Sequence, residues 1–319
     1  MIFFSIIISV FNNEDLITRA VNSVLNQKFD DYELLIVNDG SSDNTPVLIK
    51  NLADKNNKIK IITHEKNESL HVSRMDGVSK ANGKYILFLD GDDYYTNNAL
   101  SILYKEIQKN PDCDLYEFGY LKKPSNKKAV PSFLEQDRFS SYLKSKKSPT
   151  HTMWNKVYDS QLIKKAFSVM ERTYLNYVED IYESIIISFF TKKTYLINKI
   201  IINYSIATGI SNTYKDYNKL IIYLKSMHIM QELLTNFLIS NNVTAALDNI
   251  NFKLLKYVIN NYVHTQKNES DVKKAYLLLP EYFDINIIID YLYQRDTSLK
   301  KMDFISKSFL YKLYRFLSK

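Results

Sequence analysis

The sequence predicts an α/β protein, in which helices flank a mostly parallel sheet and a smaller all-α region follows. Apolar, β-branched runs alternate with segments of helical periodicity over the first 120 residues. Polar and acidic residues follow directly after three of these runs. From about residue 213 onward the apolar residues keep only helical spacing. Strands and helices that alternate with short connections are typical of parallel, doubly wound sheets.

Each element of the first 120 residues has its own local signal. The run from Phe3 to Val10 is almost continuously apolar, as expected of a strand buried on both faces. Leu16, Ala20 and Val24 share one face of a helix. By the same criteria, further strands are expected at 32–37, 59–63, 84–89 and 114–120, and further helices at 69–82 and 96–109. Another helix is expected to begin near Pro46, because proline suits the first turn of a helix.

The pattern changes after residue 120. Residues 121–147 hold eight Lys and Arg against two acids, with two prolines, and predict an exposed basic insertion. Later, one helical stripe consists of Leu220, Leu224, Met227, Leu234 and Leu238, and shorter ones lie at 251–264 and 272–279. Residues 299–319 predict a basic amphipathic helix. We therefore expect one domain over 1–212 and a helical domain over 213–319.

Composition excludes several classes of protein. The chain has 319 residues and a net charge of +7, which is too modest for a dedicated nucleic-acid binder, and no nucleic-acid-binding module is recognisable. The only cysteine, Cys113, excludes an internal disulfide and a thiolate-rich zinc site. No segment resembles a signal peptide or is apolar enough to span a membrane. These features predict a cytoplasmic protein.

The carboxyl ends of the predicted strands carry the candidate ligands, since open α/β sheets bind ligands there. One such end holds Asp90-Gly91-Asp92-Asp93. Clustered carboxylates repel one another unless a cation neutralises them, and carboxylate oxygens suit Mg²⁺ or Mn²⁺. The alternative interpretation is a helix N-cap with solvated acids.

Two further residues suggest nucleotide contacts. Asp39 ends another strand and could accept hydrogen bonds from an imide N–H or from ribose hydroxyls, while Gly40 allows close backbone approach. Arg74 could meet a base or a phosphate, or form a surface ion pair. The five histidines match no metal or catalytic motif, so we interpret them as structural or surface residues.

An ordered set of motifs now gives a family resemblance. These are S-I-I-I-S-V-F-N-N-E, V-N-D-G-S-S-D, N-x-S-x-x-x-S-R-x-x-G, A-x-G-K-Y-I-L-F-L-D-G-D-D, W-N-K-V-Y and V-E-D-I-Y. Over about residues 1–212 the chain resembles the family 2 inverting glycosyltransferases of the GT-A fold, which build bacterial surface polysaccharides and glycoconjugates. No single motif would be specific, but the ordered set is.

The resemblance implies a UDP-sugar donor, carrying a hexose or an N-acetylhexosamine, and Mn²⁺ or Mg²⁺. It implies that Phe11 and Asp39 contact the uracil, and that Asn67 and Arg74 contact the base or ribose. The full set of nucleotide-sugar-binding residues that it implies is Val10, Phe11, Glu14, Asp39, Asn67, Arg74, Asp90 and Gly91.

The resemblance also implies the catalytic groups. Asp90 and Asp92 match the D-x-D pair, with Asp92 the more direct metal ligand, and Asp180 matches the catalytic base. The acceptor hydroxyl needs a carboxylate to take its proton, and the metal stabilises the charge on the leaving UDP. Glu179 is the alternative base, and the acidic pair could instead only favour a helix N-terminus.

Trp154, with Asn155 and Lys156, is a candidate for the acceptor side, because its ring could stack on a sugar face. The alternative is a core tryptophan. The chain departs from many relatives at Ser9, Asn38, Ser69 and Met75, none of which removes a charge that the mechanism needs. It also lacks the Arg that often follows the position of Tyr204, and Lys192, Lys193 or Lys199 is the expected substitute at the pyrophosphate.

The expected partners are the donor and a saccharide, glycoprotein or lipid-linked acceptor. The helix at 299–319 could hold the chain on the inner face of the membrane, or it could be an ordinary packing helix. The helical domain could also form a homodimer or bind a partner glycosyltransferase. Two other classes compete: a nucleotidyltransferase, which would need a Gly-rich basic loop after the first strand, and a membrane-surface or interaction module with a degenerate GT-A domain.

Overall fold

The computed structural model describes residues 2–131, 138–144, 150–206, 217–243, 247–259, 278–284 and 287–288. The chain divides into two compact units, residues 1–210 and 211–319, which are considered separately below. The strands, all in the first unit, are β1 (Phe4–Val10), β2 (Tyr32–Asn38), β3 (Ile59–Thr63), β4 (Tyr85–Phe88), β5 (Tyr94–Tyr95), β6 (Leu115–Lys123), β7 (Lys127–Ala129), β8 (Lys156–Asp159) and β9 (Thr194–Ser205). Its helices are α1 (Ile17–Leu25), α2 (Thr45–Ala53), α3 (Leu70–Lys80), α4 (Ala99–Lys109), α5 (Arg138–Lys144), α6 (Ser160–Ser168) and α7 (Glu179–Phe190).

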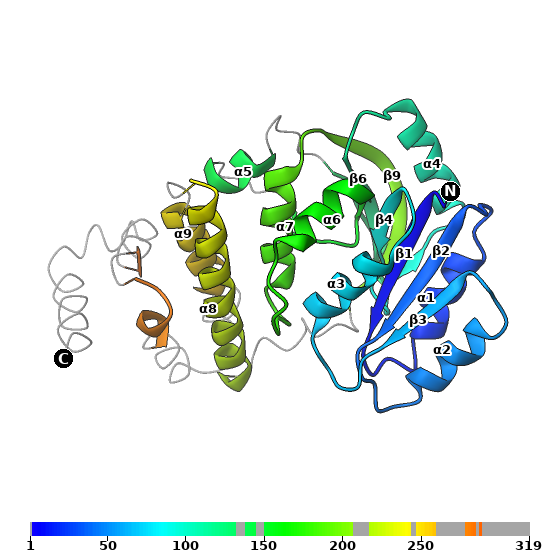
Figure 1. Cartoon of the computed structure of the whole chain (residues 1–319), viewed down its shortest axis with the longest axis horizontal. Coiled ribbons are helices and arrows are strands. Elements are labelled where there is room, and N and C mark those ends of the chain that lie inside the picture. The colour runs from blue at the N-terminus through cyan, green and yellow to red at the C-terminus, as the bar shows by residue number, and fades with distance from the viewer. Residues whose placement is uncertain are drawn as a thin grey trace, which may run out of the picture. The chain divides into compact units, whose positions relative to one another are not determined.

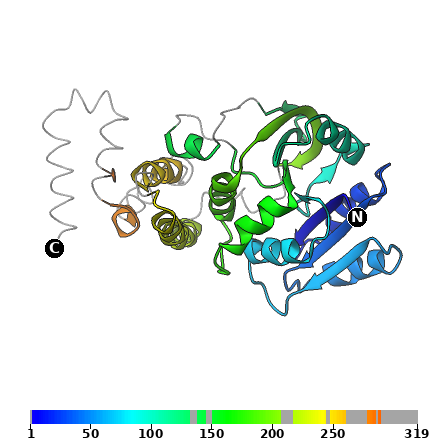
Figure 2. The ribbon, with the colours of Figure 1, turned by 45° about the horizontal axis from the view of Figure 1, so that its top comes forward.

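The described strands form one mixed sheet in the order β3-β2-β1-β4-β8-β6-β9-β5, with β7 paired to β6. The first four of these strands are parallel, as expected, and their carboxyl ends lie at one edge. Helices cover both faces of this part of the sheet (Figure 1). In Figure 2 the blue strands of the parallel half lie side by side.

Strand β1 lies at the centre of the parallel half and is buried on both faces, as its apolar run predicts. Phe4, Ile6 and Ile8 join the core cluster that includes the buried residues of α1 and α4. Ile7 points to the other face, where α3 packs so closely that a Cβ on Gly77 would lie 2.5 Å from its Cγ2. This packing holds α3 against that face of the sheet.

Of the second half of the sheet only one strand was predicted. Strand β8 lies between β4 and β6 and is antiparallel to both. The predicted strand at 114–120 corresponds to β6, which therefore does not adjoin the parallel half and instead pairs in parallel with β9. Sequence patterns indicate that a strand exists, but they do not give its neighbour when the neighbour is distant along the chain.

The prediction of a wholly exposed basic insertion was wrong. Residues 121–123 extend β6, and residues 127–129 form β7. Arg138 is buried and its Nη1 lies 2.9 Å from Oε2 of Glu117, which is also buried. The attraction between the two charges offsets the free-energy cost of taking the arginine out of water. The remaining basic residues of the insertion include Lys122, Lys127 and Lys128, which are partly or fully exposed.

The second unit is helical where it is described. It contains α8 (Tyr217–Ser240), α9 (Leu247–Val258) and a 3₁₀ helix at Leu279–Glu281. The stripe predicted on α8 is confirmed, because its five members are each at most 1% exposed: Leu220, Leu224, Met227, Leu234 and Leu238. The segments 260–277 and 299–319 lie outside the described residues.

Candidate active site

Three loops meet at the carboxyl ends of β1, β2 and β4. The backbone N–H of Asn12 donates to Oγ of Ser41 at 3.0 Å, which joins the first loop to the second. A Cβ on Gly91 would lie 2.9 Å from Nδ2 of Asn13, so the third loop approaches the first closely. Val10 is buried, whereas Phe11 is 46% exposed. The predicted nucleotide-binding residues of these loops are thus neighbours.

The acidic cluster at the end of β4 has three members. Carboxylate oxygens of Asp90, Asp92 and Asp93 lie within 4.8 Å of one another. Burial raises the pKa of Asp90 to about 7, with Arg74 opposing the shift, and burial together with the Asp90 charge raises the pKa of Asp93 to about 9. One oxygen of Asp93 is buried without a hydrogen-bond partner. Such a set of oxygens fits a divalent cation, which would supply the missing positive charge.

A single arginine connects this cluster with the start of α7. The guanidinium of Arg74 is 2% exposed, and its Nη2 lies 3.8 Å from Oδ1 of Asp90. Its Nη1 lies 2.6 Å from Oδ1 of Asp180 and 2.9 Å from Oε2 of Glu183. Arg74 is therefore buried among carboxylates, and the prediction that it could form a surface ion pair was wrong. Contact with a base or ribose stays a prediction that this arrangement does not favour.

The two carboxylates at the start of α7 lie in different environments. The side chain of Asp180 is 31% exposed and is held by Arg74. Glu179 is only 9% exposed, and one of its oxygens is buried without a partner. Burial and the nearby charge of Asp180 raise the pKa of Glu179 well above its ordinary value. Burial also raises the pKa of Asp180, and the Arg74 charge opposes the shift at both carboxylates.

A buried pair, Glu183 and His71, holds Arg74 in position, and the sequence analysis did not identify it. Glu183 is fully buried, and its second oxygen lies 2.8 Å from Nδ1 of His71, which is also fully buried. The other ring nitrogen of His71 lies 3.1 Å from the backbone oxygen of Glu171. This chain of contacts fixes the guanidinium that touches Asp180. The spacing of His71 and Arg74, three residues apart on α3, was the available signal.

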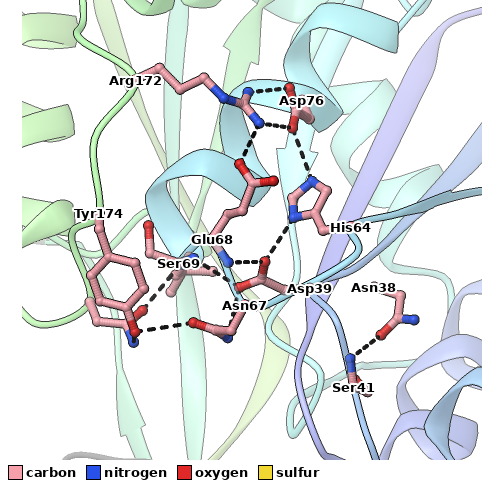
Figure 3. Close-up of polar contacts among 12 residues, drawn as sticks. Asn38, Asp39, Ser41, His64, Asn67, Glu68, Ser69, Asp76, Arg172 and Tyr174 are labelled. Atoms are coloured by element: carbon pink, nitrogen blue, oxygen red, sulfur yellow. Dashed lines mark hydrogen bonds and ion pairs between the residues drawn. The ribbon is translucent and has the colours of Figure 1, made fainter.

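Asp39 lies at the end of β2, where it organises the loop before α3 (Figure 3). Its Oδ1 accepts from the backbone N–H of Glu68 and lies 2.7 Å from Nδ1 of His64. Its Oδ2 accepts from Nδ2 of Asn67 and from the backbone N–H of Ser69. Both oxygens thus have two contacts within the protein. The roles of Asp39 and Asn67 toward a nucleotide stay predictions, and the structure gives them a loop-holding role as well.

His64 extends this network to the segment that precedes α7. Its Nε2 lies 2.9 Å from Asp76, so its two ring nitrogens face two carboxylates. Arg172 then pairs with Asp76 and with Glu68, as Figure 3 shows. The interpretation of His64 as a structural residue agrees with these contacts.

Two hydrogen bonds complete the connection between the loop before α3 and the segment before α7. The hydroxyl of Tyr174 donates to Oδ1 of Asn67 at 3.1 Å (Figure 3). The backbone N–H of Leu175 donates to Oγ of Ser69. The sequence analysis missed Arg172 and Tyr174, because their partners are about a hundred residues away and no local pattern indicates the pairing.

The three residues predicted for the acceptor side are buried. Trp154 is 4% exposed and stacks on Tyr204 with ring centroids 4.9 Å apart. Nζ of Lys156 contacts oxygens of Thr150, Thr152 and Asn155. The alternative of a core tryptophan therefore describes Trp154, and its ring is not available for stacking on a sugar in this structure.

The lysines expected to replace a pyrophosphate-binding arginine lie far from the acidic cluster. The backbone N–H groups of Lys192 and Lys193 donate to Asp114, before the first residue of β9. The acidic cluster is near the last residue of β9, where the N–H of Ser205 donates to Asp93. A strand of this length spans roughly 35 Å at about 3.3 Å per residue. Lys199 is exposed in the middle of β9.

Glu14 remains near the first loop but is engaged with the second, because its Oε2 accepts from the backbone N–H of Asn44 at 2.8 Å. The structure thus brings Asp90 and Asp180 together through Arg74, with Asp92 beside Asp90. It brings Val10, Phe11, Asp39 and Asn67 to the neighbouring strand ends. Trp154, Asn155 and Lys156 are buried, and Lys156 lies near enough to Asp180 for the charge of each to shift the pKa of the other. Within the described part of the chain, no helix is both long and apolar enough to cross a bilayer.

Two bacterial proteins are similar to part of this chain. EpsJ of Bacillus subtilis is 34% identical over 135 residues, which are 42% of this chain and 39% of EpsJ. The GalNAc(5)-diNAcBac-PP-undecaprenol beta-1,3-glucosyltransferase of Campylobacter jejuni is 32% identical over 116 residues, 36% of this chain and 37% of that protein. The match therefore spans well under half the length of either relative.

Solved structures show the same fold. The structure of S. aureus TarS 1–349 in complex with UDP-GlcNAc superimposes with a TM-score of 0.64 at 19% identity, covering 89% of this chain and 82% of that one. The chain therefore has the GT-A fold. The model of the family described as "Glycosyl transferase family 2" matches residues 5–166, which include β1 to β4, the acidic cluster and β8. The chain belongs to glycosyl transferase family 2.

Proposed function

We propose that this chain is a metal-dependent inverting glycosyltransferase that moves a hexose or an N-acetylhexosamine from a UDP-sugar to an acceptor hydroxyl. The observation that carries the proposal is the position of Arg74, whose guanidinium contacts both Asp90 and Asp180. One buried guanidinium thus holds the candidate metal ligand and the candidate base beside each other. Membership of the family supports the same class of reaction.

The donor is proposed to be a UDP-sugar. TarS, which shares the fold, binds UDP-GlcNAc, and the Campylobacter jejuni relative is named a glucosyltransferase. In this chain Phe11, Asp39 and Asn67 lie at or beside the ends of β1 and β2, where the nucleotide would bind.

Asp90, Asp92 and Asp93 would hold Mn²⁺ or Mg²⁺. When bound, the ion supplies positive charge that stabilises the diphosphate as it leaves. The cation also relieves the mutual repulsion of the carboxylates, which burial otherwise intensifies. The buried oxygen of Asp93 without a partner is consistent with a position that a cation would fill.

Asp180 is proposed as the base that takes the proton of the acceptor hydroxyl. The hydroxyl oxygen forms a bond to the anomeric carbon while the bond from that carbon to the UDP oxygen breaks, and UDP leaves with the electron pair. Attack from the side opposite to UDP inverts the anomeric configuration. Arg74 favours the ionised form of Asp180, whereas the deeper burial of Glu179 favours its protonated form. Asp180 is therefore the better base of the two.

The acceptor is proposed to be a saccharide, a glycoprotein or a lipid-linked glycan of the kind used in bacterial surface polysaccharides. The Campylobacter jejuni relative acts on an undecaprenol-linked glycan by its name. With the acceptor side unassigned in this chain, the donor half of the reaction is the better place to begin testing.

The test is UDP release from a panel of UDP-sugars, measured on the intact chain with Mn²⁺ and with EDTA. We expect release from at least one donor with Mn²⁺ and none with EDTA. Asp92→Asn should abolish it, and the matched control Asp54→Asn, at an exposed acid on the C-cap of α2, should not. Metal-independent release, or equal release by Asp92→Asn, would contradict the proposal.

A further inference from the structure

A chain of hydrogen bonds with a single direction runs from α3 to Asp39 through the segment that precedes α7. The backbone N–H of Leu70 donates to Oδ1 of Asn176 at 3.2 Å, which fixes the end of this amide that carries the oxygen. Nδ2 of Asn176 donates to the hydroxyl oxygen of Tyr174 at 3.0 Å. The Tyr174 hydroxyl then donates to Oδ1 of Asn67, and Nδ2 of Asn67 donates to Oδ2 of Asp39 at 2.9 Å (Figure 3).

This chain gives the side-chain amide of Asn67 one orientation. The carboxylate of Asp39 only accepts hydrogen bonds, so it requires the nitrogen end of the amide. The hydroxyl of Tyr174 accepts from Asn176, so its proton is directed at the oxygen end of the Asn67 amide. Turning the amide over would place its oxygen against the carboxylate and its N–H groups against the hydroxyl proton. Both contacts would be lost.

Asn67 retains groups that a ligand can use. Among the described residues, no partner takes its second N–H or the second lone pair of its Oδ1. The side chain is partly exposed, so water satisfies these groups in the free protein. Each oxygen of Asp39, in contrast, already has two contacts within the protein. Asn67 therefore carries spare hydrogen-bonding groups at this strand end, and the position of its donor and of its acceptor is fixed.

A fixed amide discriminates between the two pyrimidines. Uracil presents an N3–H donor beside its O4 acceptor, whereas cytosine presents an N3 acceptor beside its N4 amino donor. An amide that turns over freely pairs with either base, because the turn exchanges donor and acceptor. A fixed amide pairs with one of them and leaves the other with mismatched groups, which is an effective way to reject an analogue.

The segment that carries Tyr174 is anchored on both sides of this residue. The ring of Tyr174 is 53% exposed. The backbone N–H of Leu175 donates to Oγ of Ser69 at 3.2 Å, and Nη2 of Arg172 lies 2.8 Å from Oε2 of Glu68. The hydroxyl of Tyr174 is thus held beside the loop before α3 although its ring is largely open to solvent. Removal of the hydroxyl alone leaves these anchors in place.

We propose that Tyr174 is a positioning residue that gives the nucleotide site its preference for uracil over cytosine. It acts through Asn67, whose amide it holds in the orientation that matches uracil. The inference rests on the proposed function, because it requires the donor nucleotide at the ends of β1 and β2. It deepens that function by naming a residue that selects the base.

The experiment is calorimetric titration of UDP and of CDP into the intact chain with Mn²⁺, and the quantity compared is the ratio of the two dissociation constants. We expect the wild type to bind UDP at least about tenfold more tightly than CDP. Tyr174→Phe should weaken UDP binding by about five- to tenfold, as the loss of a hydrogen bond implies, and change CDP binding by less than about twofold.

A second variant reverses the chain of hydrogen bonds without removing the tyrosine. Asn176→Asp keeps an acceptor for the backbone N–H of Leu70, but it takes the Tyr174 proton away from Asn67. The preference for UDP should fall as far as in Tyr174→Phe, and an added charge that repels both nucleotides leaves their ratio unchanged. The matched control is Tyr104→Phe, at an exposed tyrosine of α4, which should keep both affinities.

The outcomes separate this inference from the proposed function. Absence of UDP binding by the wild type would contradict both. With UDP bound by the wild type, three results would overturn the inference alone: no preference over CDP, a preference that Tyr174→Phe retains, or equal weakening of the two nucleotides, which indicates a merely structural tyrosine. Thermal unfolding shows whether each variant is folded. Should Tyr174→Phe unfold, Asn176→Asp decides, and a retained preference there would overturn the inference.

Discussion

Arg74 is the residue on which the geometry of the active site depends. It is buried, yet it contacts Asp90 and Asp180, which come from elements far apart in sequence. Burial alone would lower the pKa of the Arg74 guanidinium. The charges of the four surrounding carboxylates outweigh that effect, so the pKa lies well above its ordinary value. The arginine therefore stays charged at any working pH, and the carboxylates around it share its charge.

The assignment of the base gives the first prediction at this scale. Asp180→Asn should lower the turnover number by about 10²–10⁴, the usual contribution of a general base. Glu179→Gln should lower it by less than about tenfold, because burial raises the pKa of Glu179 and disfavours the charged form that a base needs. Steady-state kinetics on the donor identified by UDP release measures both. Loss of turnover in Glu179→Gln, with Asp180→Asn active, would reverse the assignment.

At the scale of elements, the sequence predicted most of the parallel half and little beyond it. β1 to β3 and α1 to α4 begin and end within a few residues of the predicted bounds, because apolar periodicity is a local property. The position of β8 between β4 and β6 depends on hydrogen bonds between distant segments. No local pattern contains that information.

The same distinction applies to the candidate site. The three strand-end loops could be predicted, since parallel strands share an edge. The contact of Arg74 with Asp180 spans 106 residues, and that of Tyr174 with Asn67 spans 107. Arg138 was predicted on the surface because of its charge, and no local pattern pairs it with Glu117 on the predicted strand at 114–120.

The contact between α5 and β6 gives a stability prediction. Glu117 is buried beside Arg138 and Lys156; burial alone would raise its pKa, but the two cations lower it below its usual 4.5. Glu117→Gln leaves the buried Arg138 without its carboxylate partner, and should lower the free energy of unfolding at pH 7 by about 3–5 kcal/mol. Urea denaturation measures this, with Glu65→Gln, an exposed acid, expected within about 0.5 kcal/mol of the wild type.

The pH dependence of that difference follows from the lowered pKa of Glu117. A group whose folded pKa is depressed stabilises the protein above its unfolded value and loses this contribution as pH falls through the folded value. The gap between wild type and Glu117→Gln should therefore be complete at neutral pH and shrink below about pH 4.5. A gap that stays constant from pH 7 to pH 3.5 would show that the ion pairs are not its cause.

At the scale of the whole molecule, the helical second unit has no assigned role. Its final segment, 299–319, carries six basic residues and one acid along an apolar stripe. We expect the intact chain to co-sediment with vesicles containing anionic lipid more than with neutral vesicles, because basic amphipathic helices bind anionic surfaces. Deletion of 299–319 should remove that difference. Equal co-sedimentation of the two chains would leave the segment without a membrane role.

The central claim is that the acidic cluster at the end of β4 binds a divalent cation together with a uridine diphosphate. Calorimetric titration of UDP into the intact chain, with Mn²⁺ and with EDTA, tests it without any knowledge of the sugar or the acceptor. We predict binding that requires Mn²⁺ and that is lost in Asp92→Asn while Asp54→Asn retains it. Binding of equal strength in EDTA, or no binding under either condition, would contradict the claim.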